Sequence, residues 1–252
     1  MKAIHTTALA IFVMSFTLTG NAMMISGNGL QNGLNAITVG GDFRDVNDPN
    51  SREGGDDKWR VSATGISSMR LLFEMAGFRN TNSFGIYDPS DVNTRLELFS
   101  GSDSSTSGPG GTPAFEILFN FTSNTFSSLG GGFAEVTFSS NTFGFYLDSS
   151  SEDRGGIFYS EQSKNADGVD HMITFAGNGS ELLNLGGFPS SFETGEYILA
   201  WEDLDCSVTT CDNDFNDMVV LVESVYAVPN PGTVLLFGLG LFGIGIASRR
   251  KA

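Results

Sequence analysis

Short segments rich in phenylalanine and β-branched residues recur along this 252-residue chain, and glycine, serine, asparagine or aspartate separates each from the next. Such segments are typical of β-strands joined by tight turns. The sequence predicts strands at residues 83–87, 95–99, 114–121, 133–138, 142–147, 156–159, 170–176, 195–201 and 218–226. Strands of this length and spacing favour an all-β fold, a jelly-roll-like β-sandwich whose core is filled by many of the 22 phenylalanines.

One short helix is expected before these strands, because apolar residues recur there at helical spacing and a glycine follows them. These residues are Ile66, Met69, Leu72, Phe73 and Ala76, with Gly77 as the stop. The preceding residues 23–58 are rich in turn formers, so we expect them to lie loosely against the domain with a short strand near residues 36–39. The sandwich domain itself is expected to span residues 59–227.

The N-terminus has the order of a secretory signal peptide. Lys2 precedes an apolar run from Ala8 to Leu18, and residues 20–22 supply small side chains at the position of cleavage. We therefore expect residues 1–22 to be removed on export.

Residues 228–252 have the pattern of a short transmembrane helix. An uncharged apolar run at residues 233–247 is followed by the basic residues Arg249, Arg250 and Lys251. The positive-inside rule places this basic cluster in the cytoplasm and the rest of the chain across the inner membrane. The run is shorter than the about 20 residues of a permanent span. A segment that is later removed is therefore favoured over an ordinary anchor helix, and both alternatives give the same topology.

The tetrapeptide Val228, Pro229, Asn230 and Pro231 comes directly before the apolar run. Together with that run and the basic end, it resembles the PEP-CTERM sorting tail of Gram-negative bacteria, with Asn230 where the family usually has glutamate. The resemblance implies recognition by an exosortase, a membrane protease-transpeptidase, and an envelope that produces exopolysaccharide. It also implies a domain that is held in the periplasm and then carried to the cell surface or beyond.

Three parts of the domain carry a second resemblance. They are residues 76–88, residues 167–175, and the pair YILAWEDL at 197–204 and DNDFNDMVV at 212–220, of which the last pair is the most specific. They resemble an uncharacterised domain family of exported bacterial proteins that often stands directly before PEP-CTERM tails. The resemblance implies export and a β-rich extracellular fold, and it implies no enzymatic activity.

The charge of the domain excludes one class of partner. Between the two targeting ends the chain has 9 basic and 29 acidic residues, a net charge of −20. A domain of this charge is repelled by nucleic acid and by anionic lipid headgroups. We expect no nucleic-acid partner, whereas the many carboxylates suit divalent cations.

The densest set of candidate ligands lies between the last two predicted strands. It consists of Glu202, Asp203, Asp205, Asp212, Asp214, Asn216 and Asp217. These side chains would repel one another if left unpaired, and Ca²⁺ relieves such repulsion by accepting about six to eight oxygen ligands in flexible geometry. The sequence predicts a structural Ca²⁺ site here, with a solvated acidic turn as the alternative.

Cys206 and Cys211 lie within the same loop. In an oxidising compartment we expect them to form a disulfide that fixes the shape of the loop. A redox-active pair would more typically have C-x-x-C spacing.

A catalytic role is not expected for the domain. His171 is the one histidine that remains after signal removal, and no G-x-S-x-G motif accompanies it, so a hydrogen-bonded structural role is favoured. We interpret the chain as a non-enzymatic surface or extracellular-matrix protein. The first alternative is a carbohydrate-binding module that attaches to exopolysaccharide through an exposed Trp59 or Trp201. The second is a glycoside hydrolase with two carboxylates about 5 to 10 Å apart.

Overall fold

The computed structural model describes residues 24–228, apart from 54–56, 76–77, 79–80, 100–113, 130–133 and 187. The expected signal peptide and the tail from Pro229 onward, with its apolar run, lie outside these residues. Within them, no helix has the length and apolar character needed to cross a membrane. Most of the regular structure is β-strand, which confirms the predicted all-β sandwich.

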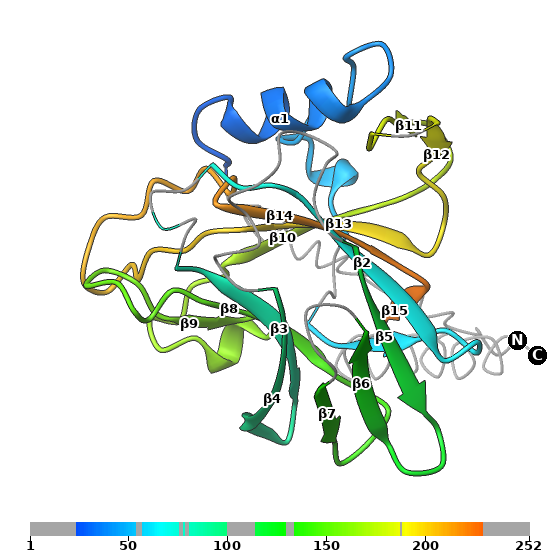
Figure 1. Ribbon diagram of the computed structural model, residues 1–252. Helices are drawn as coiled ribbons and strands as arrows, with labels where there is room; N and C mark the ends of the chain where they lie inside the picture. Colours follow the sequence, from blue (N-terminus) through cyan, green and yellow to red (C-terminus); the bar gives the residue numbers. More distant parts are fainter. Residues whose placement is uncertain are drawn as a thin grey trace, which may run out of the picture.

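Two antiparallel sheets face each other across the core (Figure 1). The larger sheet has the strand order β10-β13-β14-β2-β5-β6-β7, and the smaller has the order β4-β3-β8-β9. The large sheet consists of β2 (Ile66–Phe73), β5 (Ala114–Asn120), β6 (Thr125–Leu129), β7 (Ala134–Thr137), β10 (Met172–Ala176), β13 (Glu196–Trp201) and β14 (Met218–Glu223). The small sheet consists of β3 (Ser83–Asp88), β4 (Asp91–Phe99), β8 (Gly144–Asp148) and β9 (Ile157–Tyr159).

Shorter elements complete the described chain. Two pairs of strands stand apart from the main sheets, and two 3₁₀ turns lie in the connections. They are β1 (Trp59–Val61) with β15 (Val225–Ala227), β11 (Leu182–Leu183) with β12 (Ser190–Ser191), η1 (Pro49–Ser51) and η3 (Gln162–Lys164).

The core between the two sheets is rich in aromatic side chains. Phe145 of β8 lies at its centre, with ring centroids 5.5 Å from Phe84, 5.6 Å from Trp59 and 5.3 Å from Phe143. All four side chains are fully buried. The alternation of apolar and polar residues in the strands thus directs one face of each sheet into this layer.

A second apolar layer covers the opposite face of the large sheet. The helix α1 (Gly29–Ile37) lies over this face (Figure 1) and buries Leu30, Leu34 and Ile37 against it. Gly33 permits the close approach, because a Cβ there would lie 2.5 Å from the ring of Phe73 in β2. The central strands β13 and β14 are consequently covered on both faces, which explains their nearly continuous apolar sequences.

The predicted helix around residues 66–76 is wrong. Residues Ile66–Phe73 form strand β2, which pairs with β14 and β5. Met69 and Leu71 point into the core between the sheets, whereas Leu72 belongs to the layer under α1. Because both faces of β2 are buried, it has apolar residues on both sides, and their combined spacing resembles that of an apolar helical face.

The N-terminal segment also differs from expectation. The predicted strand near residues 36–39 is instead the end of α1, followed by an isolated bridge between Thr38 and Leu183. Leu30, Leu34 and Ile37 recur at i, i+4 and i+7, so one helical face is apolar and is buried on the sheet.

All nine predicted strands are present, with ends shifted by a few residues. The last of them, residues 218–226, is divided by Ser224, whose φ of 59° separates β14 from β15. Three pairs join β15 to β1, and the Val228 N–H donates to the Lys58 carbonyl at 2.7 Å. The described chain therefore remains attached to the domain up to the first residue of the predicted tail.

Asp88 connects the turn after β3 to the segment after β7. It is buried, and its carboxylate accepts hydrogen bonds from the backbone N–H and the hydroxyl of both Ser90 and Ser139. Burial alone raises the pKa of this carboxyl, but the four hydrogen bonds outweigh burial and hold the pKa below its usual value. A lowered folded-state pKa stabilises the fold above about pH 4, and this stabilisation is lost as the pH falls through the folded-state pKa.

We expect Asp88→Asn to lower the free energy of unfolding at neutral pH by about 1–3 kcal/mol, because an amide replaces a charged acceptor. Urea unfolding of both proteins across the acid range measures this difference, which should shrink below about pH 4. Asp153→Asn, at an exposed aspartate, is the control. A difference between Asp88→Asn and wild type that is independent of pH would contradict the prediction.

Candidate metal centre

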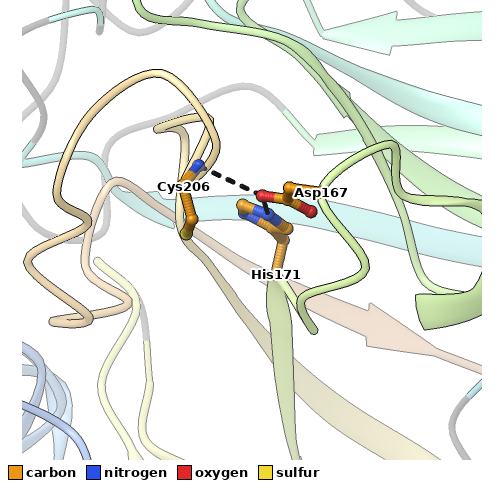
Figure 2. Close-up of side chains that lie close together, drawn as sticks. All are labelled: Asp167, His171 and Cys206. Atoms are coloured by element: carbon orange, nitrogen blue, oxygen red, sulfur yellow. Dashed lines mark hydrogen bonds and ion pairs between the residues drawn. The ribbon is translucent and has the colours of Figure 1, made fainter.

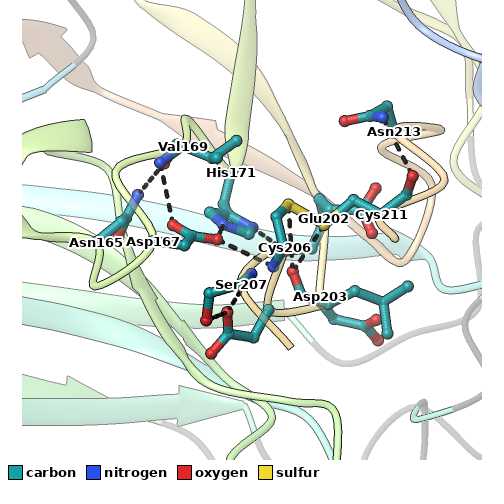
Figure 3. Close-up of a disulfide and its surroundings, with 12 residues drawn as sticks. Asn165, Asp167, Val169, His171, Glu202, Asp203, Cys206, Ser207, Cys211 and Asn213 are labelled. Atoms are coloured by element: carbon teal, nitrogen blue, oxygen red, sulfur yellow. Dashed lines mark hydrogen bonds and ion pairs between the residues drawn. A yellow bond between two sulfur atoms is a disulfide. The ribbon is translucent and has the colours of Figure 1, made fainter. Parts of the chain in front are cut away.

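The connection between β13 and β14, residues 202–217, carries all the predicted ligands. Cys206 and Cys211 are disulfide-bonded within it, with an S–S distance of 1.98 Å and a Cα–Cα distance of 5.2 Å (Figure 3). The antiparallel pairing of Trp201 with Met218 brings the two ends of the connection together. Residues at its start and at its end therefore lie side by side.

Four carboxylates converge at this point. Glu202, Asp212, Asp214 and Asp217 each place one carboxylate oxygen within 4.8 Å of the others. Oxygens bound to one Ca²⁺ lie at most about 5 Å apart, since each Ca–O distance is about 2.3–2.6 Å. Among the described residues, no lysine or arginine forms an ion pair with these four side chains. The arrangement thus has the spacing of a cation site, and no described basic side chain forms an ion pair with it.

Glu202 is the most unusual member of the group. Its side chain is 1% exposed, and neither carboxylate oxygen has a hydrogen-bond donor in the described part of the chain. Burial, followed by the negative charge of Asp212, raises the pKa of Glu202 to about 8. A buried carboxylate without a partner is costly, so this position calls for either a proton or a metal ion.

Asp203 and Asp217 are also buried carboxylates with raised pKa values, although each accepts a hydrogen bond. The Asp203 N–H donates to Asp217 Oδ2 at 2.9 Å, and Asn82 Nδ2 donates to Asp203 Oδ2 at 3.0 Å. Burial, followed by the charges of Asp203 and Glu202, raises the pKa of Asp217 to about 10. Burial also raises the pKa of Asp203. The raised pKa values of Glu202 and Asp217 favour their protonated forms when no cation is bound, and a cation would displace these protons.

Three of the predicted ligands lie outside the convergent group: Asp203, described above, Asp205 and Asn216. Asp205 accepts hydrogen bonds from the N–H and the hydroxyl of Ser207, in a turn of its own. The side-chain amide of Asn216 lies against Gly29 at the start of α1, where a Cβ would collide with it. The expected alternation thus holds for Asp212 and Asp214 and ends before Asn216.

The backbone conformation explains that change of direction. Asn213 and Phe215 have φ values of 55° and 51°, in the left-handed region. Phe215 is buried in the layer under α1, and the Ser26 N–H donates to the Asn213 carbonyl at 2.8 Å. The acidic side chains consequently face one way while the intervening residues attach the loop to the N-terminal segment.

His171 supports the loop from β10. One ring nitrogen, Nε2, lies 2.9 Å from Asp167 Oδ2, and Nδ1 lies 3.1 Å from the Glu202 carbonyl oxygen. Asp167 Oδ2 also accepts the Cys206 N–H at 3.1 Å (Figure 2). The fully buried ring stacks on Phe158 with centroids 3.8 Å apart. These contacts agree with the hydrogen-bonded structural role expected for His171.

Sequence reasoning missed Asn82 and Asp167. Asn82 Nδ2 bridges Glu74 and Asp203, and Asp167 joins His171 to the disulfide loop. Both residues lie in segments that carry the family resemblance, residues 76–88 and 167–175, but nothing there singles them out, and their contacts with Asp203 and Cys206 span long separations in the chain.

Solvent reaches the acidic group through a pocket of about 160 Å³. It is lined by Phe78, Arg154, Asp203, Leu204, Asp212 and Asp217. Glu202 and Asp214 do not line it, so the pocket exposes one side of the group and leaves Glu202 behind it. An ion could enter from this side.

Comparisons with known proteins cover the second half of the chain. Residues 128–225 match a domain of unknown function (DUF4114), and residues 227–251 match the PEP-CTERM protein-sorting motif. No curated protein and no solved structure matches the chain. The domain match includes the acidic loop, the disulfide and His171.

The sorting motif shows that the protein is exported to the envelope and implies recognition by an exosortase-type processing enzyme. Upstream of the motif lies the matched domain, for which no activity is assigned. The chain is therefore a PEP-CTERM protein that carries an uncharacterised domain.

Proposed function

We propose that this protein is a non-enzymatic component of the cell envelope or extracellular matrix whose exported domain is stabilised by one bound Ca²⁺ ion. The observation that carries the proposal is Glu202, a fully buried carboxylate for which the described residues supply no hydrogen-bond donor, beside three further carboxylates. The sorting tail would hold the domain on the periplasmic side of the inner membrane before release to the surface.

Calcium suits the donor set better than other common cations. All four convergent groups are carboxylates, which Ca²⁺ binds in variable number and geometry. Zn²⁺ prefers nitrogen and sulfur ligands. Mg²⁺ requires near-octahedral geometry at about 2.0–2.1 Å and retains several waters, which a group with Glu202 at 1% exposure accommodates poorly.

The two alternative functions have less support. A hydrolase needs carboxylates that reach its substrate, whereas Glu202 is shielded from solvent and lies in direct electrostatic conflict with its neighbours. A carbohydrate-binding module that stacks sugars on tryptophan needs an exposed indole. Trp59 and Trp201 are both fully buried in the core between the sheets.

Isothermal titration of the full chain with CaCl₂ tests the proposal. We expect one ion per chain, and a binding heat that varies with the buffer because carboxyl protons are released. Glu202→Gln should weaken binding at least about tenfold, or 1.4 kcal/mol. Asp205→Asn is the matched control, since this aspartate of the same loop lies outside the group.

Three results would overturn the proposal: no binding by the wild type, equal affinity for Mg²⁺, or the same loss in both variants.

A further inference from the structure

We propose that the same loop, when its two cysteines are reduced, forms a zinc site from Asp167, His171, Cys206 and Cys211. This site is distinct from the proposed calcium centre, because it uses none of the four convergent carboxylates. It would hold a transition metal in the dithiol state and lose it when the disulfide forms.

Three of the four donor groups already converge, and the fourth, Cys211, is joined to them through its bond to Cys206. Asp167, His171 and Cys206 each place one ligand atom within 4.8 Å of the others, and Cys211 Sγ is bonded to Cys206 Sγ. Ligand atoms of one tetrahedral zinc ion lie about 3.3–3.8 Å apart, given Zn–N and Zn–O distances of about 2.0–2.1 Å and Zn–S distances of about 2.3 Å. After reduction the two sulfurs must separate, and the donors must move closer to one another to reach this spacing.

The donor set is one that zinc prefers. Two cysteines, a histidine and an aspartate supply sulfur, nitrogen and oxygen ligands, and the C-x₄-C spacing of Cys206 and Cys211 lies within the usual range for zinc. Two thiolates, one carboxylate and a neutral imidazole give a net charge of −1 with Zn²⁺. Zn²⁺ would therefore offset two of the three negative charges of its ligands.

The groups around the donors have the orientation found at zinc sites. A metal-bound histidine commonly donates its other ring N–H to a backbone carbonyl. In this protein His171 Nδ1 is 3.1 Å from the Glu202 carbonyl, which leaves Nε2 to face Asp167 and Cys206 (Figure 2). Stacking on Phe158 holds the plane of the ring. The imidazole is thus aimed at the place where the metal would lie.

Zinc binding requires that the disulfide first be reduced. A dithiol or phosphine reductant gives two electrons to the Cys206–Cys211 disulfide, the S–S bond breaks, and two protons are taken up to form two thiols. Zinc binding then releases both thiol protons and any second proton on His171. No reductant is needed for a newly exported chain, because its cysteines leave the cytoplasm as thiols and are oxidised only afterwards.

Cobalt substitution tests the proposal on the full chain, with CaCl₂ present throughout so that the outcome does not depend on the calcium centre. Chain reduced with a phosphine should bind one Co²⁺, with thiolate-to-cobalt charge-transfer absorption and the visible bands of tetrahedral cobalt. Equimolar Zn²⁺ should abolish both the charge-transfer absorption and the visible bands. The oxidised chain should show neither signal, and this comparison requires no variant.

His171→Asn should weaken zinc binding by the reduced chain at least about tenfold. Asp170→Asn is the matched control, because this adjacent carboxylate accepts the Met172 N–H and is not among the four donors. The proposal is overturned if reduced wild type shows no thiolate-to-cobalt band, if the oxidised chain gives the same spectrum, or if His171→Asn binds as tightly as wild type.

Discussion

Ca²⁺ at about a thousand times its dissociation constant is expected to stabilise the full chain by about 4 kcal/mol. For a domain of this size each kcal/mol shifts the Tm by about 2–4 °C, so the expected rise is about 8–16 °C. The physical reason is the convergent group, in which Glu202 is fully buried with no donor among the residues that the structure describes, and Asp217 has a strongly raised pKa. Differential scanning calorimetry in CaCl₂ and in EDTA measures the shift.

Glu202→Gln should change the Tm both in CaCl₂ and in EDTA. The variant should lose most of the calcium-dependent rise, because the buried ligand is gone. In EDTA the Tm of the variant should be higher than that of wild type. Without calcium, wild type must either bury a charged Glu202 or protonate it on folding, and a neutral glutamine avoids both costs. Asp205→Asn should keep the wild-type response. A wild-type Tm that is equal in calcium and EDTA, or an unchanged response of Glu202→Gln, would contradict the calcium centre.

Phe145→Ala should destabilise the domain by about 3–5 kcal/mol, the usual cost of removing a buried aromatic ring. The loss should be at the upper end, because the ring contacts Trp59, Phe84 and Phe143 and the cavity would lie between two sheets that cannot close over it. The expected fall in Tm is about 6–20 °C. Thermal unfolding by circular dichroism measures it.

Phe188→Ala is the matched control for that change, since its side chain is 98% exposed. Surface substitutions of this kind shift stability by about 0.5 kcal/mol or less. Similar losses in the two variants would show that the centre of the aromatic core is not where the structure puts it.

Most strands of the two sheets could be predicted from the sequence, including β13 and β14 with both faces covered, whereas β2 was mistaken for a helix. β5 alternates Ile117 and Phe119 with more polar neighbours, so its period is visible. β2 has Leu71 facing the core and Leu72 facing the helix layer, so its alternation is hidden. α1 was missed because glycine and asparagine dominate its sequence, although Leu30, Leu34 and Ile37 have helical spacing.

Some residues of the candidate metal centre could be predicted from the sequence, and others could not. Glu202, Asp212, Asp214 and Asp217 could be found because one short connection carries them all. That Asp205 and Asn216 face elsewhere depends on a local turn and on the packing of α1, which composition does not reveal. The hydrogen bond from Asn82 to Asp203 spans 121 positions of the chain, and that from Cys206 to Asp167 spans 39. Contacts over such separations require the folded topology.

The attachment of β15 has a mechanical consequence. A pull on the tail enters the domain at Val228 and must first break the three pairs between β15 and β1. The load then passes through Ser224 into β14, which lies in the large sheet between β13 and β2. Asp217 directly precedes the other end of that strand, so a cation bound there would stabilise the same strand that receives a pull on the tail.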